Sequence, residues 1–226
     1  MLSTPITTRA TLALTLLSLL ASPASAVSWY FLTYYPASGA YFTEFSGSMV
    51  VPAIPAAATY YLWPGLQPTD GSGVYQNVLD GTSGTWWFGS GWCCSNPSLA
   101  WGGGFNTYEG ETNTFSNVRT DDENWTTTIV HGSTGTSDVN TFALSDKSFN
   151  QAIFAIELYD VSWNFGSLTF KDVTIKAEGS TDSSWCTSDP SNYNSATVYS
   201  ITGASASVSG TTVTCTIESV VLESPA

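Results

Sequence analysis

The sequence predicts an all-β protein, built as a two-sheet antiparallel β-sandwich of the jelly-roll type. Helical periodicity is almost absent after the first 26 residues. The chain instead offers many short runs rich in Val, Ile, Thr, Tyr, Phe and Trp, and Gly, Asn, Asp, Ser or Pro separates each run from the next. No internal repeat and no long linker is visible, so we expect a single β-sandwich domain over residues 27–226.

About ten runs have the composition of strands. In chain order they are Ser28–Tyr35, Tyr60–Trp63, Gly73–Leu79, Thr85–Trp92, Trp125–Val130, Asn140–Leu144, Ala152–Val161, Ser167–Lys176, Thr197–Ile201 and Thr211–Val220. The segment Val51–Ala57 is expected to enter the sandwich in an extended form. The loop-rich stretch Asn96–Glu111 contains the aromatic segment Trp101–Phe105, which could border a cleft or pack as a surface loop.

The N-terminus has the features of a secretory signal peptide over residues 1–26. Arg9 supplies the positive charge, residues 11–20 form a mostly apolar run, and Ala24-Ser25-Ala26 is a cleavage site of the A-x-A type. We therefore expect a secreted, extracellular protein whose mature chain begins at Val27. A run of about ten apolar residues is too short to span a bilayer, so no membrane partner is expected.

The charge balance is strongly acidic, with 5 Lys and Arg against 18 Asp and Glu and a net charge of −13. Nucleic acid is excluded as a partner on this ground, because phosphate contacts require Lys and Arg. Such a balance suits an acidic medium, where protonation relieves the repulsion between carboxylates. It also suits solubility alone, and both interpretations stay open. We expect a monomer.

Four cysteines in a secreted chain predict disulfide bonds. They are Cys93, Cys94, Cys186 and Cys215, which allow three pairings. Adjacent residues of a strand point to opposite faces, so Cys93 and Cys94 either bond to each other or serve two different partners. We favour Cys186–Cys215 together with a vicinal Cys93–Cys94 bond.

Neither a metal nor any other cofactor is expected. The single histidine, His131, lies in a loop of Gly, Ser and Thr, and no Cys-x-x-Cys motif occurs. The sequence Asn124-Trp125-Thr126 is an N-glycosylation signal, which predicts an exposed, glycosylated Asn124.

Two apolar segments each carry one reactive polar residue. Gln76 lies in Gly73–Gly81, and Glu157 lies in Ala152–Asp160. With the two-residue period of a strand, Gln76 shares a face with valines, and Glu157 shares a face with Ile, Ala and Tyr. A carboxylate among apolar neighbours is costly to desolvate, so its pKa rises. A Gln–Glu pair on one sheet could therefore bind and activate a water molecule.

In their order and spacing, these two segments resemble the catalytic strands of the fungal glutamic peptidases, the eqolisin family. The preceding strand Tyr60–Leu66 contains Trp-Pro-Gly and is similar to the Trp-x-Gly strand of that family, and Phe154–Glu157 is similar to its apolar-apolar-Glu strand. A further similarity lies in Ser209–Cys215. The resemblance extends from roughly Pro52 to the C-terminus and implies a concanavalin A-like sandwich.

The resemblance also implies a reaction and the roles of two residues. Glu157 would be the general base that takes a proton from the attacking water and then gives that proton to the leaving amine. Gln76 would donate a hydrogen bond to the oxyanion of the tetrahedral intermediate. The implied activity is that of a hydrolase, an acid endopeptidase acting on a polypeptide substrate.

The same resemblance places three residues at the substrate-binding surface: Trp63, Trp87 and Gln67. Two positions differ from the family pattern. Gln67 stands where the family has an Asp, and Gly89 or Ser90 stands where the family has a Glu.

A second interpretation is carbohydrate binding or cleavage, with a polysaccharide as the partner. The chain has nine Trp, of which four are clustered and could stack on sugar rings: Trp86, Trp87, Trp92 and Trp101. A glycosidase would need two carboxyls, and Glu157 has possible partners in Asp80 and Asp172. A polysaccharide lyase is less favoured, because the chain has few basic residues.

A third interpretation is a non-catalytic relative that keeps the sandwich alone. The three interpretations require different structures. A peptidase requires Gln76 and Glu157 to face one cleft, and a carbohydrate-binding protein requires an exposed tryptophan platform. In an inactive relative, Gln76 would bond within the sandwich and Glu157 would pair with a cation such as Lys171.

Overall fold

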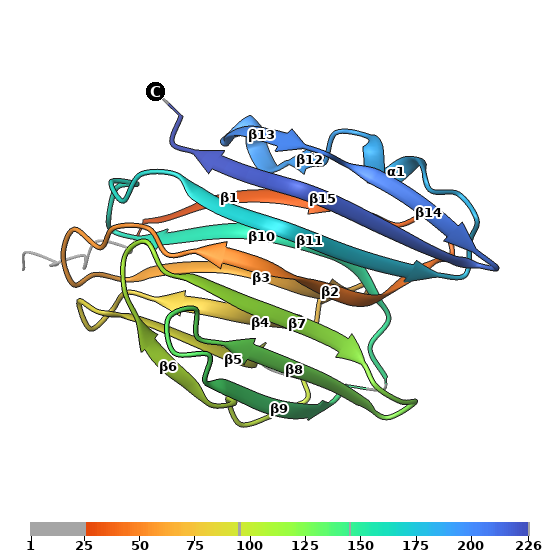
Figure 1. Cartoon of the computed structure of the whole chain (residues 1–226), viewed down its shortest axis with the longest axis horizontal. Coiled ribbons are helices and arrows are strands. Elements are labelled where there is room, and N and C mark those ends of the chain that lie inside the picture. Colours follow the sequence, from red (N-terminus) through yellow and green to blue (C-terminus); the bar gives the residue numbers. More distant parts are fainter. Residues whose placement is uncertain (1–25, 95, 145, 226) are drawn as a thin grey trace, which may run out of the picture.

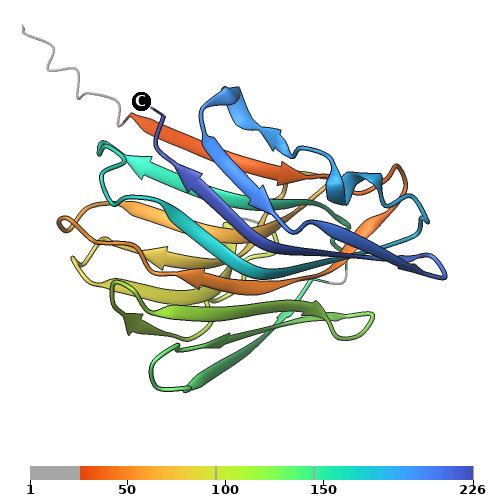
Figure 2. The same ribbon diagram turned by 45° about the horizontal axis from the view of Figure 1, so that its top comes forward.

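The structure, a computed structural model, describes residues 26–94, 96–144 and 146–225. It confirms the predicted two-sheet antiparallel sandwich, whose layers lie one behind the other in Figure 1 and appear from a second direction in Figure 2. The seven-stranded sheet has the order β12 (Ser191–Asn192), β1 (Val27–Tyr34), β10 (Phe149–Tyr159), β3 (Tyr60–Pro68), β4 (Gly73–Asp80), β5 (Trp86–Cys94) and β6 (Gly104–Thr107). The eight-stranded sheet has the order β13 (Val198–Thr202), β15 (Thr212–Glu223), β11 (Leu168–Glu178), β2 (Tyr41–Val50), β7 (Thr112–Arg119), β8 (Asn124–Val130) and β9 (Ser137–Ala143), and β14 (Ser205–Ser209) also pairs with β15. Two short helices, α1 (Ser184–Thr187) and η1 (Tyr193–Ser195), lie in the connections near β12.

The main core lies between the two sheets and is rich in aromatic rings. In β10 every second side chain points inward, so Phe154 is fully buried. Its ring meets the ring of Phe45, from β2 of the other sheet, at a centroid distance of 5.2 Å and an interplanar angle of 89°. Phe45 in turn meets Phe115 at 5.4 Å. Such edge-to-face contacts join the sheets through apolar burial.

A buried polar network also crosses the core. The side-chain amide of Asn77 donates to the hydroxyl of Thr127 at 2.9 Å, and the amide of Asn117 donates to Oδ1 of Asn77 at 2.6 Å. All three residues are fully buried, so these hydrogen bonds offset the cost of removing their polar groups from water. Because Asn77 points inward, its neighbour Gln76 points to the outer face of the seven-stranded sheet.

A second, smaller apolar cluster covers that outer face. Its buried members are Trp63, Val78, Ile153 and Ala155, and Phe31, Tyr61 and Val74 pack against them. The outer face of an antiparallel sheet is usually polar and solvated. An apolar outer face therefore marks the region where a ligand is expected to bind.

The structure adds strands that the sequence pattern did not indicate. β2 and β7 lie side by side in the middle of the eight-stranded sheet, where β7 buries the polar side chains of Asn113 and Asn117. β3 runs past Trp63, its predicted end, and continues through Pro64 to Pro68. The pairing between β3 and β4 is interrupted there, between the pairs Leu62–Leu79 and Gly65–Gln76.

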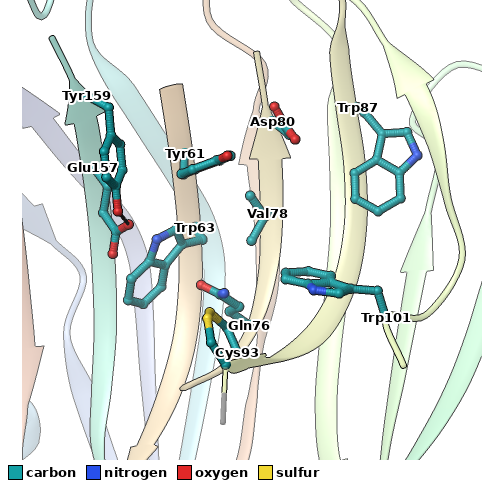
Figure 3. A pocket seen from close by; sticks show the side chains of 11 residues that line it. Tyr61, Trp63, Gln76, Val78, Asp80, Trp87, Cys93, Trp101, Glu157 and Tyr159 are labelled. Carbon is teal, nitrogen blue, oxygen red and sulfur yellow. Dashed lines mark hydrogen bonds between the residues drawn. A yellow bond between two sulfur atoms is a disulfide. The ribbon is translucent and has the colours of Figure 1, made fainter. Parts of the chain in front are cut away.

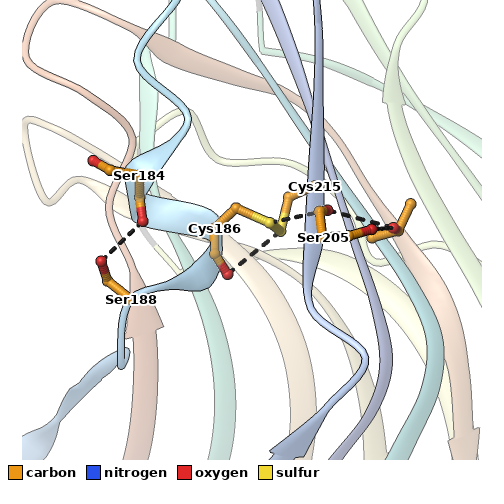
Figure 4. The surroundings of a disulfide bond; sticks show 6 residues. Ser184, Cys186, Ser188, Ser205 and Cys215 are labelled. Atoms are coloured by element: carbon orange, nitrogen blue, oxygen red, sulfur yellow. Dashed lines mark hydrogen bonds between the residues drawn. A yellow bond between two sulfur atoms is a disulfide. The ribbon is translucent and has the colours of Figure 1, made fainter.

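The cysteines pair as Cys93–Cys94 and Cys186–Cys215. In Figure 4 the second bond ties α1 to β15. Its S–S distance is 2.07 Å and its residues are 29 apart in sequence. By the loop-entropy relation, a crosslink of this span stabilises a fold by roughly 3–4 kcal/mol.

The expected signal peptide, residues 1–26, lies outside the described residues except for Ala26. Within the described ranges, no helix is long and apolar enough to cross a membrane.

Candidate active site

A pocket of about 500 Å³ opens on the outer face of the seven-stranded sheet, over β10, β3, β4 and β5 (Figure 3). It is lined by Tyr61, Trp63, Gln76, Val78, Asp80, Trp87, Cys93, Cys94, Trp101, Glu157 and Tyr159. This set brings together both predicted catalytic residues and two of the three predicted substrate-binding residues.

Glu157 and Gln76 reach the pocket from the two strands that flank β3. Glu157 on β10 pairs with Tyr61, and Gln76 on β4 pairs with Gly65. Trp63 lies halfway between these two levels of β3, and Figure 3 shows its indole between the Glu157 carboxyl and the Gln76 amide. The two polar side chains therefore approach a common space from opposite sides of one tryptophan.

Small residues around Trp63 allow its indole to lie close to the sheet. Ala155 is its partner on β10 and is fully buried. A Cβ atom at Gly65 would lie 3.0 Å from Cε3 of Trp63, so the ring occupies the space that a side chain there would need. The sequence Trp-Pro-Gly thus produces a flat aromatic floor between the two polar groups.

The environment of Glu157 raises the pKa of its carboxyl above the ordinary value of 4.5. Burial in the apolar pocket is the largest cause, and hydrogen bonds from Tyr159 and the indole of Trp63 oppose it. The Tyr159 hydroxyl donates to Oε2 of Glu157 at 3.3 Å. Burial and the Glu157 charge raise the pKa of Tyr159 as well, so this hydroxyl remains a donor.

Within the described part of the chain, Glu157 has no cationic partner. Lys171, the cation considered for that role, lies on β11 of the other sheet and is exposed there. Asp172, the carboxyl considered as a glycosidase partner, lies beside it on β11. Asp80, the other carboxyl considered, does line the pocket and accepts a hydrogen bond from the backbone of Thr82 at 2.8 Å.

Two indoles cover the wall of the pocket over β5 and β6. The outward positions there are glycines: Gly89, Gly91 and Gly104. A Cβ at Gly89 or Gly104 would collide with the Trp87 ring, and one at Gly91 would collide with the Trp101 ring. The indole of Trp87 thus fills the space over Gly89, one of the two positions matched to the Glu of the family pattern.

Hydrogen bonds to β9 and β5 fix the loop that carries Trp101. Gly103 donates its N–H to Oδ1 of Asn140 at 3.1 Å, and Asn140 donates to the Ser90 hydroxyl at 3.3 Å. The N–H of Gly102 donates to the Ser90 carbonyl at 2.9 Å. The predicted aromatic segment therefore borders the cleft, held as an extension of β6.

Other sequence-based expectations turn out differently. Trp86 and Trp92 are almost fully buried in the main core, so only two of the four clustered tryptophans, Trp87 and Trp101, lie at the pocket. Gln67 lies further along β3, paired with Gln151 and away from the pocket lining. Tyr159 was not predicted to have a role at the site, although its position two residues after Glu157 places both side chains on one face.

No family model matches the chain, and no curated protein matches it. Solved structures do match. A crystal structure of scytalido-glutamic peptidase with a peptide-based transition state analog has a TM-score of 0.54 and 18% sequence identity, covering 86% of this chain and 100% of that one. A second structure of that peptidase, with a transition state analog inhibitor, gives 0.52 and 17% with the same coverage. SCP-B, a member of the eqolisin family of peptidases in a complex with the tripeptide Ala-Ile-His, gives 0.51 and 19%, again with 86% and 100%. This chain has the fold of the glutamic peptidases.

The fold shared with the glutamic peptidases confirms the resemblance read from the sequence. The differences from the family pattern lie at separate places within that fold. Neither Gln67 nor Gly89 is among the residues that line the pocket, but Gly89 lies beneath the ring of Trp87, which does; Ser90, the other position matched to the family's Glu, is fully buried.

Proposed function

We propose that this protein is a secreted acid endopeptidase of the glutamic type that cleaves polypeptides. The observation that carries the proposal is that Glu157 and Gln76 line one pocket from opposite sides of Trp63. Two of the structures that share the fold contain a peptide-based transition state analog and a tripeptide, which supports a polypeptide substrate.

In the first step, a water molecule held between the two side chains attacks the scissile carbonyl carbon. Glu157 accepts the proton of that water as the new C–O bond forms. The carbonyl oxygen becomes an oxyanion, and the side-chain amide of Gln76 donates a hydrogen bond to it. The hydrogen bond from Tyr159 holds the Glu157 carboxyl in one orientation throughout.

In the second step, the tetrahedral intermediate collapses and the C–N bond breaks. Glu157, now protonated, gives its proton to the departing amine and returns to the carboxylate form. Because burial raises the pKa of Glu157, the ionised carboxyl is a stronger base than an ordinary glutamate. The hydrogen bonds from Tyr159 and Trp63 favour the charged form and offset part of the effect of burial.

The test is cleavage of a denatured protein at about pH 3–6, where carboxyls titrate, in the presence of pepstatin. The variant Glu157→Gln keeps the shape of the side chain and removes the base. Glu109→Gln makes the same change at an exposed turn and serves as the matched control. Cleavage by the wild type and the control, with none by Glu157→Gln, supports the proposal. A folded wild type that cleaves nothing would overturn it.

One observation favours a second candidate, glycoside hydrolysis. Asp80 lines the same pocket as Glu157, and each pairs with Tyr61 from a strand on either side of β3. Two strand spacings separate their backbones by roughly 10 Å, near the separation of the carboxyls in inverting glycosidases. Asp80→Asn distinguishes the candidates, because it abolishes glycoside cleavage and leaves Gln76 and Glu157 in place for peptide cleavage.

Secretion belongs to the same proposal. We infer that residues 1–26 direct export, that residues 27–226 form the single mature domain, and that Asn124 carries a glycan. In the structure, Nδ2 of Asn124 donates to the Asp121 carboxylate at 3.1 Å, so an attached glycan would have to share or replace this contact. The intact mass of protein secreted from a eukaryotic host, before and after removal of N-glycans, tests the cleavage site and the glycan together.

A further inference from the structure

An aromatic cluster lies on the other side of Glu157 from the pocket. Trp29 on β1 pairs directly with Glu157 on β10, so the two side chains point to the same outer face. Phe31 pairs with Ala155 and also points outward. Trp29 is 44% exposed, which is unusual for so large an apolar side chain beside a candidate catalytic carboxyl.

A third ring completes the cluster, which we call the aromatic shelf: Trp29, Phe31 and Tyr193. Tyr193 from η1 lies 6.2 Å from the Trp29 ring and 5.9 Å from the Phe31 ring, between centroids, and is 43% exposed. Phe31 is 5.6 Å from Trp63, the floor of the pocket. The shelf is therefore continuous with the pocket through the Phe31–Trp63 contact.

We propose that the aromatic shelf is a second substrate subsite, which binds an aromatic or large aliphatic side chain of the polypeptide. This inference rests on the function proposed above. The side chain would belong to a residue on the side of the scissile bond that faces away from Gln76. β1 is about 4.8 Å from β10 and an extended peptide rises about 3.3 Å per residue, so the shelf reaches residues one to three positions from the bond.

The arrangement of the rings favours a side chain over a sugar. Trp29 and Phe31 are nearly parallel, at 19°, whereas Tyr193 is tilted by 58° to Trp29 and by 40° to Phe31. The rings therefore form a notch with walls at an angle, which can enclose a bulky apolar group. A pyranose ring stacks best on a single exposed aromatic face. None of the three shelf side chains is charged, and their only polar groups are the indole N–H of Trp29 and the hydroxyl of Tyr193, so the surface that the rings offer is mostly apolar.

The experiment measures positional preference with a peptide series. In a background of Ala and Ser, Phe is placed in turn at each position from the third before to the third after the cleaved bond. The variants are the double substitution of Trp29→Ala with Tyr193→Ala, and Tyr108→Ala as the control, since Tyr108 is 60% exposed elsewhere. Circular dichroism and thermal melting check that each variant folds.

We expect the wild type and Tyr108→Ala to cleave peptides with Phe at one position on one side of the bond about 10–100 times faster, in kcat/KM, than the unsubstituted peptide. In the double variant this ratio falls close to one at that position and stays unchanged elsewhere. A preference for Phe that persists in the double variant would contradict the proposal that the aromatic shelf is a subsite, and it would still support the proposed peptidase activity. A wild type that cleaves none of the peptides overturns the proposed function instead. Competition by a soluble oligosaccharide that is lost only in the double variant would overturn the polypeptide as occupant.

Discussion

Glu157 and Glu111 both accept a hydrogen bond from a side-chain hydroxyl, yet their pKa values move in opposite directions. Glu111, just before β7, accepts from Ser133 at 2.5 Å and from Thr107 at 2.7 Å, and its pKa falls to about 2. Glu157 accepts a hydrogen bond from one side-chain hydroxyl, that of Tyr159, at 3.3 Å. Its pKa rises because the effect of burial is larger than the effect of this bond. Burial is the dominant cause at Glu157, whereas the donated hydrogen bonds are the dominant cause at Glu111.

The two glutamates therefore suit different tasks. A carboxylate that stays ionised to about pH 2 can hold a loop in acid, and Glu111 also lies 3.6 Å from Nε2 of His131. A carboxyl with a raised pKa in a pocket can exchange protons with a substrate. The same side chain is structural in one place and suited to acid–base chemistry in the other, because one site is rich in donors and the other is apolar.

The largest expected effect is a difference in peptide cleavage between variants of the two glutamates. Glu157→Gln removes the proposed base and should lower kcat/KM by about 10²–10⁴-fold, the usual contribution of general acid–base catalysis. Glu111→Gln leaves the pocket untouched, because Glu111 is not among its lining residues, and should cleave like the wild type. The measurement is kcat/KM on one peptide at the pH optimum. Equal losses in both variants would mean that Glu157 acts through folding and not through chemistry.

The next effect concerns the hydroxyl of Tyr159, which donates a hydrogen bond to Glu157. Tyr159→Phe removes a hydrogen bond that lowers the pKa of Glu157, so that pKa rises further. The acid limb of the kcat/KM profile should move to higher pH, and activity on the acid side should fall by about tenfold, the lower end of what one hydrogen bond to a charged group contributes. Activity on the high-pH side of that limb should change little. A profile that falls at every pH without moving would show that Tyr159 only shapes the pocket.

Much of this site could be anticipated, because it lies on strands with a clear two-residue period. Glu157 alternates with the inward apolar residues Ile156 and Leu158, so its face follows from the sequence, whereas the outward direction of Gln76 depended on the burial of its polar neighbour Asn77. The order and spacing of their segments also indicated the family. Their convergence on one pocket needed the register of both strands against β3, which no local pattern encodes.

The features that could not be predicted from the sequence depend on contacts between distant parts of the chain. β7 was not predicted because its inward positions include Asn113 and Asn117, whose burial is offset by partners on other elements. The run of strand residues was given as Tyr60–Trp63, but β3 continues through Pro64, which cannot donate a backbone hydrogen bond. The strand tolerates it because the pairing with β4 is interrupted at that point. Trp29 was likewise expected in a strand, but its place beside Glu157 follows from the pairing of β1 with β10.

A smaller effect concerns stability in acid. The pKa of Glu111 falls from an ordinary 4.5 to about 2 on folding, so its ionised form stabilises the fold above pH 4.5 and this contribution is lost as the pH falls toward 2. Glu111→Gln should therefore lower the melting temperature by about 2–4 °C at neutral pH, and the difference should vanish near pH 2. Glu109→Gln, at the neighbouring turn, is the control and should leave the melting curve unchanged. A deficit that persists undiminished to pH 2 would show that the Glu111 charge does not support the fold.

The smallest effect has the opposite sign and concerns Glu157. Its pKa is raised in the folded state, so its contribution to stability is complete below pH 4.5 and is lost as the pH rises through the folded pKa. Glu157→Gln should not lose stability as the pH rises, because an amide stays uncharged and no charge has to be buried. The variant should match the wild type in acid and melt about 1–2 °C higher at neutral pH, a gain in stability where activity is lost. Thermal melting at both pH values measures it. If the variant melts lower at neutral pH, the ionised carboxyl is stabilised by stronger contacts than Tyr159 and Trp63 provide. Burial would then not explain why the pKa values of Glu157 and Glu111 differ.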